Sequence, residues 1–176
     1  MLFRSPDDPE SNYGMANAAM LSKVPVRPEL VHRVQAELSD ANVAADGYEA
    51  ELRSSIGAGV TVPKLDLILL GLGADGHTAS LFPGTRALLE RNRLVVANWV
   101  DSFEAYRITM TLPIINAARL IVFMVSGAAK AEAVRDVLQP QWSSLPLPAA
   151  LVRPVDGRVL WLLDGAAASL LKKDPA

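Results

Sequence analysis

The chain has 176 residues, 17 basic and 19 acidic side chains, and a formal net charge of -2 at pH 7. Hydrophobic residues make up 51 % of it, so we expect one compact domain with a sizeable core rather than a disordered chain. The nearly balanced charge gives no electrostatic reason to bind nucleic acid or an anionic membrane. Because the chain has no cysteine and only two histidines, we exclude a disulfide framework, thiolate chemistry and a histidine-rich metal site.

We also expect no targeting signal and no membrane span. No apolar run approaches the roughly 20 residues of a transmembrane helix. Acidic residues appear as early as Asp7 and Asp8, where a secretory signal would have an apolar stretch. We therefore predict a cytoplasmic protein with no membrane partner.

The first half of the chain predicts two helices and then a buried strand. Residues 11–22 are rich in alanine and methionine and follow Ser11 or Asn12 as N-cap. Residues 40–55 carry apolar side chains at helical spacing, and Gly57 ends them. Leu65 to Leu70 is an almost wholly apolar run followed by glycine, which is typical of a parallel strand covered on both faces.

The second half alternates strands with helices. Residues 94–100 and 106–112 are strand candidates, and Arg107, Thr109 and Thr111 give the second of them one polar face. The remaining elements are a strand over 119–125, a helix over 128–138, a strand over 159–163 and a closing helix over 165–171. This order predicts an α/β fold in one domain spanning residues 1–176, with a mainly parallel open sheet and helices on both faces, similar to a Rossmann fold.

The most informative segment runs from Leu70 to Gly84 and reads Leu-Gly-Leu-Gly-Ala-Asp-Gly-His-Thr-Ala-Ser-Leu-Phe-Pro-Gly. It directly follows the strand over 65–70, and open α/β sheets bind ligands beyond the carboxyl ends of their strands. Its glycines allow a sharp turn and close approach of a ligand. Asp75 and His77 are one residue apart in that turn, and a histidine can take a proton from water near pH 7.

Two other interpretations of this segment stay open. Gly71, Gly73 and Gly76 match the G-x-G-x-x-G dinucleotide fingerprint, with Asp101 downstream. Pro83 limits any helix that begins at His77 to a turn or two, which is too short for the usual crossover helix and disfavours this interpretation. In the other interpretation, His77 is a structural histidine without a chemical role.

The segment closely resembles the signature of the 6-phosphogluconolactonases, and the resemblance covers nearly the whole chain. Further stretches follow in the family's order: Asp8 to Gly14, Arg107 to Pro113, Asn116 to Arg119, Ser126 to Lys130, Leu147 to Ala149 and Trp161 to Asp164. The resemblance implies hydrolysis of 6-phospho-D-glucono-1,5-lactone to 6-phosphogluconate in the pentose phosphate pathway. It implies no cofactor and no metal.

The resemblance also implies roles for particular residues. His77 would be the general base, and Asp75 would orient it or the backbone of the pocket. The amides of Gly73 and Gly76 would face the substrate. Arg107 and Lys130 would bind its phosphate or the developing oxyanion, although either alone would ordinarily be interpreted as surface charge.

The chain departs from the family pattern in two places. The family normally has about a third more chain in front, with strands, a phosphate-binding loop and an Asp-Glu-Arg motif. We therefore expect an N-terminally truncated domain with an open sheet edge through which copies oligomerise. Arg4 could replace the missing arginine only with a shifted alignment. The family's Lys-Pro-Pro, before the strand that carries Arg107, is replaced by Phe103 to Tyr106.

Two alternative functions follow from these departures. One is an inactive remnant or a sugar-phosphate-binding protein. The other is an isomerase of the glucosamine-6-phosphate deaminase type, whose motif carries an acid where this chain has Thr78 to Pro83.

Overall fold

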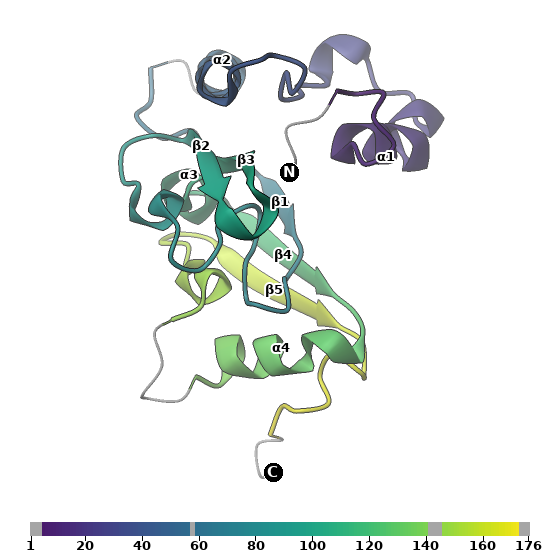
Figure 1. The fold of residues 1–176 in the computed structure, drawn as a ribbon, viewed down its shortest axis with the longest axis vertical. Helices are drawn as coiled ribbons and strands as arrows, with labels where there is room; N and C mark the ends of the chain where they lie inside the picture. Colours follow the sequence, from purple (N-terminus) through teal and green to yellow (C-terminus); the bar gives the residue numbers. More distant parts are fainter. Residues whose placement is uncertain (1–4, 57–58, 141–145, 173–176) are drawn as a thin grey trace.

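The computed structural model describes residues 5–56, 59–140 and 146–172 (Figure 1). Arg4 and Gly57 lie outside these residues. The helices are α1 (Asn12–Ala19), α2 (Ala41–Ile56), α3 (Leu112–Asn116) and α4 (Ala131–Leu138). The strands are β1 (Leu67–Leu70), β2 (Val95–Val100), β3 (Ala105–Met110), β4 (Leu120–Val125) and β5 (Arg158–Leu163).

A three-stranded parallel sheet forms the centre of the fold, in the order β1–β4–β5. Leu67 pairs with Leu120, and Ile121 pairs with Val159. Strands β2 and β3 form a separate antiparallel pair. The predicted α/β class with parallel strands is confirmed, and the carboxyl ends of β1 and β4 lie at the same edge of the sheet.

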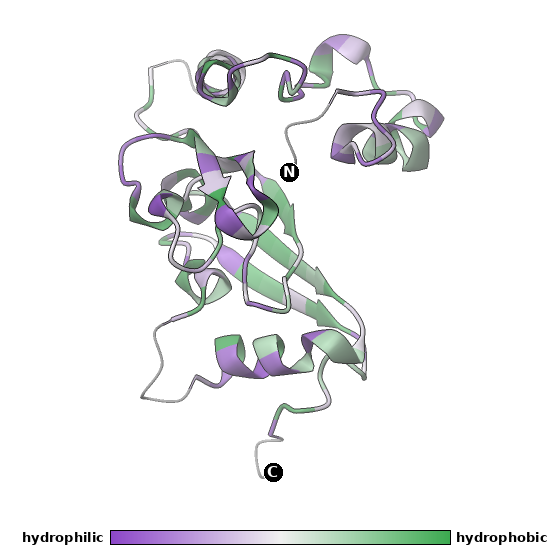
Figure 2. Ribbon diagram, viewed as in Figure 1, coloured by the Kyte–Doolittle hydropathy of each residue, from purple (hydrophilic) through white to green (hydrophobic). Residues whose placement is uncertain are grey.

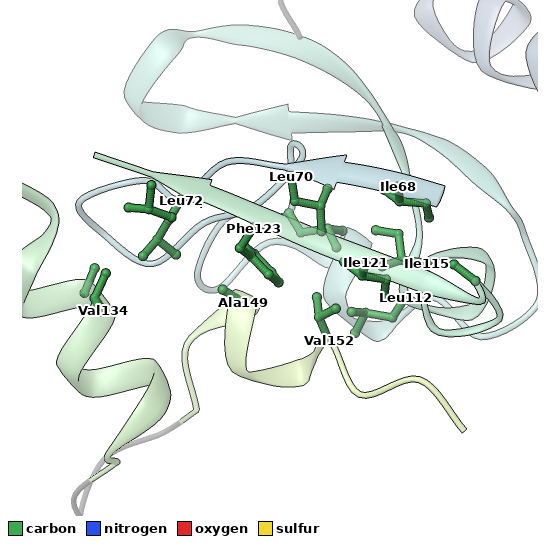
Figure 3. Close-up of a cluster of buried hydrophobic side chains, with 14 of the residues drawn as sticks. Ile68, Leu70, Leu72, Leu112, Ile115, Ile121, Phe123, Val134, Ala149 and Val152 are labelled. Carbon is green, nitrogen blue, oxygen red and sulfur yellow. The ribbon is translucent and has the colours of Figure 1, made fainter. Parts of the chain in front are cut away.

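One face of the parallel sheet carries the main hydrophobic core (Figure 3). Ile68 and Phe123 point into this core, where Ile115 of α3 and Val134 of α4 meet them. The Phe123 ring stacks on Trp161 of β5 with 4.0 Å between the ring centroids. Helices α3 and α4 therefore cover the same face of the sheet. The strands are predominantly apolar along their length (Figure 2).

The opposite face of the sheet is exposed and equally apolar. Most residues of this face are between 47 % and 60 % exposed: Leu67, Leu69, Met124, Leu160 and Leu162. Val122 of the central strand β4, which pairs with Leu69 on the same face, is only 7 % exposed. Among the described residues, β1 has a partner strand on one side only. The prediction that the strand over 65–70 is covered on both faces is therefore wrong for this structure. A wholly apolar run carries no alternation that would mark which of its faces is covered.

Two elements differ from the sequence prediction. Residues 165–170 form turns instead of a closing helix. The Asp164 carboxylate accepts hydrogen bonds from the amides of Ala167 and Gly127, which ties the start of this segment to the chain after β4. The short helix α3 was not predicted. Pro113 in its first turn suits a helix start, because proline lacks only an amide that would be unpaired there.

A buried carboxylate joins α2 to the antiparallel pair. Glu49, which is only 7 % exposed, accepts hydrogen bonds from Arg53, from Arg93 and from the amides of Leu94 and Val95. Burial, the largest influence, would raise the pKa of the Glu49 carboxyl, but these donors together hold the pKa below its usual value. The carboxylate therefore stays charged and fixes α2 against the start of β2.

Candidate active site

The signature segment folds into a tight turn directly after β1. The amide of Gly76 donates to the carbonyl of Gly73 at 3.0 Å, and the amide of Gly73 donates to the carbonyl of His77 at 2.8 Å. Gly76 has φ of +78°, which is the left-handed region that favours glycine. A Cβ atom at Gly73 would overlap the side chains of Asp75 and His77. Glycine at position 73 therefore makes room for this pair.

Both glycine amides are thus already donors inside the turn. We expected them to face the substrate, and an amide contact to substrate from Gly73 or Gly76 would require one of these internal bonds to open. The observed contribution of the two glycines is to the shape of the turn.

Asp75 and His77 are paired through their side chains. The Nδ1 atom of His77 lies 2.6 Å from Oδ1 of Asp75, and the His77 amide donates to the same oxygen at 3.2 Å. Partial burial, the largest influence, would raise the pKa of the Asp75 carboxyl. The hydrogen bonds from the His77 ring and amide nevertheless lower that pKa overall. Asp75 is therefore an anion near neutral pH and favours the tautomer of His77 that carries its proton on Nδ1.

This pairing gives the imidazole a direction for proton transfer. With Nδ1 donating to Asp75, Nε2 is the nitrogen that can accept a proton from water. A carboxylate that orients a histidine in this way is the recurring arrangement behind a histidine general base. The His77 side chain is 30 % exposed, so solvent reaches it.

The antiparallel pair holds the signature segment in place. Asn98 of β2 donates to the carbonyl of Ser80 at 2.9 Å, and the amide of Ser80 donates to Oγ1 of Thr109 in β3 at 3.1 Å. Both Asn98 and Thr109 are 3 % exposed. From the sequence, Thr109 was predicted only as part of a polar strand face, and Asn98 was not identified. Their contacts with Ser80 span 29 and 18 residues, and contacts so distant in sequence have no local signal.

Aromatic rings extend the site from His77 towards β3. The His77 ring stacks on Phe82 with 4.1 Å between centroids and 27° between planes. Phe82 in turn meets Phe103 edge to face at 5.7 Å. The Cζ atom of Arg107 lies 4.4 Å from the centroid of the Phe103 ring.

A cleft of about 710 Å³ adjoins the Asp75–His77 pair. The residues that line it include Asp75, Phe82, Arg86, Asn98 and Tyr106. The cleft is large enough for a sugar phosphate. Arg86 adds a cation to this lining that sequence analysis did not single out.

The two predicted phosphate ligands come from different elements. Arg107 is the third residue of β3. Lys130 ends the short turn of 3-10 helix that leads into α4, at the same edge of the sheet as the signature segment. The Gly127 amide, just before this turn, donates to the Asp164 carboxylate. The structure thus brings Asp75 and His77 into direct contact, and it connects Arg107 to them only through the rings of Phe103 and Phe82.

The placement of the acidic side chains and the lengths of the helices bear on metal sites and membranes. Within residues 5–56, 59–140 and 146–172, no group of three or more histidine and acidic side chains is arranged to hold a metal ion. No helix in these ranges is long and apolar enough to cross a membrane.

The sequence matches the model of a protein family described as glucosamine-6-phosphate isomerases/6-phosphogluconolactonase, over residues 3–161. The chain belongs to this family. It is similar to human 6-phosphogluconolactonase, with 42 % identity over 167 residues, which cover 94 % of this chain and 63 % of the human protein. The chain therefore spans less than two thirds of the length of that relative. The resemblance stated from the sequence motifs is confirmed.

Solved structures support the same family. The crystal structure of a devB protein matches with a TM-score of 0.89 and 36 % identity, and covers 97 % of this chain and 71 % of its own. A monomeric glucosamine-6-phosphate deaminase matches with a TM-score of 0.74 and 29 % identity, covering 96 % of this chain and 70 % of its own. The relatives of this chain thus include a 6-phosphogluconolactonase and a glucosamine-6-phosphate deaminase, and the choice between the two reactions depends on the site.

Proposed function

We propose that the protein hydrolyses 6-phospho-D-glucono-1,5-lactone to 6-phosphogluconate, a step of the pentose phosphate pathway. The observation that carries this proposal is the Asp75–His77 pair beside an open cleft at the carboxyl end of β1. The similarity to human 6-phosphogluconolactonase supports the same reaction. A cytoplasmic location stays a prediction.

The proposed chemistry is the attack of water on a cyclic ester. Nε2 of His77 takes a proton while the water oxygen forms a bond to the C1 carbonyl carbon. The bond between C1 and the ring oxygen then breaks, and the proton returns to that oxygen. Asp75 stabilises the imidazolium formed in between. Arg107 and Lys130 are the proposed cations for the phosphate, since charge-assisted hydrogen bonds are the strong ones.

Two alternative functions would use the same fold or the same cleft. A deaminase would use the same fold, but Thr78 to Pro83 lacks the acid of that motif. A protein that binds sugar phosphate without turning it over would keep the cleft and the cations. The site itself favours the lactonase, because a histidine oriented by a carboxylate serves to activate water.

The assay compares lactone opening with and without the protein. We expect it to hydrolyse freshly prepared 6-phosphogluconolactone faster than buffer alone, without added metal or nucleotide, as followed by proton release. The buffer rate is the control, because the lactone also opens spontaneously. Faster deamination of glucosamine 6-phosphate than lactone hydrolysis would overturn the assignment. Tight binding of 6-phosphogluconate by a folded but inactive protein would favour the binding alternative.

We also propose that copies of this chain associate through the apolar sheet face and the β1 edge. Exposed apolar patches and unpaired strand edges both promote association. Light scattering after size exclusion should give a mass above the monomer mass of 18.9 kDa. Leu69→Lys should reduce it, whereas Leu89→Lys, on a leucine that is 75 % exposed elsewhere, should not. A cooperatively folded monomer would contradict this proposal.

A further inference from the structure

Phe103 lies between the signature segment and the candidate phosphate ligand. It ends the short turn of 3-10 helix at Asp101–Phe103 that joins β2 to β3. One side of its ring meets the buried Phe82, which itself stacks on His77. Its face carries the guanidinium of Arg107 at 4.4 Å. Three successive ring contacts, each shorter than 6 Å, therefore connect the general base to the cation.

The connection between β2 and β3 keeps the Phe103 ring in this position. Glu104, the residue between this turn and β3, has φ of +46°, which is uncommon for a residue other than glycine. Its amide donates to the carbonyl of Asp101 at 3.1 Å. The ring itself is half exposed and does not belong to the core clusters. An exposed phenylalanine that contacts both a catalytic loop and an arginine suits a role in the site better than a role in stability.

We propose that Phe103 is a positioning residue that holds the Arg107 guanidinium towards the phosphate end of the substrate, at a set place relative to His77. This inference rests on the proposed function, since it assigns the phosphate to Arg107. A cation over an aromatic face is attracted to it by the ring quadrupole. The ring therefore limits the rotamers of a long side chain before substrate arrives, which reduces the entropy lost on binding.

The test measures affinity for 6-phosphogluconate by calorimetry in the unmodified protein and in a set of variants. Phe103→Leu keeps an apolar side chain but removes the ring, and should weaken binding by about 2- to 30-fold, the range of a lost cation–π contact. Phe103→Tyr keeps the ring and should bind like the unmodified protein. In an Arg107→Ala background, Phe103→Leu should cause no further loss, because the two residues act as one unit. Leu89→Ala is the control for an exposed apolar residue elsewhere.

A second readout needs no ligand. In the free protein, the ring shields the Arg107 side chain, so Phe103→Leu should move the Arg107 Nε–H proton resonance downfield and Phe103→Tyr should not. An unmoved resonance would overturn the contact. Equal losses of affinity for the leucine and tyrosine variants, or a loss that persists without Arg107, would overturn the positioning role. If the unmodified protein neither binds 6-phosphogluconate nor hydrolyses the lactone, the proposed function fails and this inference fails with it.

Discussion

Replacing His77 with alanine is expected to lower the rate of lactone hydrolysis by about 10²- to 10⁴-fold, the usual contribution of a general base. The substitution removes Nε2, the proposed proton acceptor, and leaves Asp75 without its ring partner. The measurement is kcat/KM for 6-phosphogluconolactone after subtraction of the spontaneous rate. Circular dichroism should show an unchanged fold, because His77 lies in a partly exposed loop.

His32 provides a matched control for this experiment. Its Nδ1 atom also lies close to a carboxylate, at 2.7 Å from Glu51, and its side chain is 32 % exposed. It lies outside the signature segment and outside the cleft beside Asp75. His32→Ala should therefore leave the rate within about twofold of the unmodified protein, an effect of less than about 0.5 kcal/mol. A folded His77→Ala variant that keeps most of its activity would show that His77 is structural.

Replacing Glu49 with alanine is expected to lower the free energy of unfolding by about 2–4 kcal/mol. The buried amides of Leu94 and Val95 would lose their side-chain acceptor, and each buried group left unpaired costs about 1–3 kcal/mol. We expect less from the two arginines, because both are partly exposed and water can solvate them. Urea unfolding at pH 7 measures the loss.

The Glu49 carboxylate also predicts how stability depends on pH. Its pKa is lowered in the folded protein, so its contribution is fully present above its unfolded pKa of about 4.3 and is lost as pH falls through the folded value. Glu49→Gln should therefore flatten the loss of stability below about pH 4. Glu29→Gln is the control, because its ion pair with Arg27 is highly exposed. Parallel acid titrations for the two glutamine variants would contradict the role of Glu49.

The parts of the fold that could be predicted are those with a local signal. The strand from Leu67 to Leu70 and the turn that carries Asp75 and His77 were recognisable from an apolar run followed by closely spaced glycines. The closing helix was predicted wrongly. Asp164 caps a helical start through the amide of Ala167, but the amides of Ser169 and Leu171 donate to carbonyls three residues back, so the segment continues as turns.

The parts of the site that could not be predicted depend on contacts distant in sequence. Phe103 was noticed only as a departure from the family pattern, and nothing near it in the chain indicates that its ring meets Phe82 and Arg107. The role of Asn98 could not be predicted either, since its hydrogen bond to the carbonyl of Ser80 exists only in the folded chain. Side chains that orient a site are recognised from the folded chain.

The exposed apolar face of the parallel sheet has a thermal consequence. Near room temperature, the burial of apolar surface is driven by entropy and weakens on cooling. In the association of copies proposed above, contacts made by Leu69, Met124 and Leu162 should therefore loosen in the cold and strengthen on moderate warming, with a negative heat-capacity change. The ion pairs of the chain do not share this behaviour. In that association, the temperature at which the protein is kept would determine how much of this face is in contact with water.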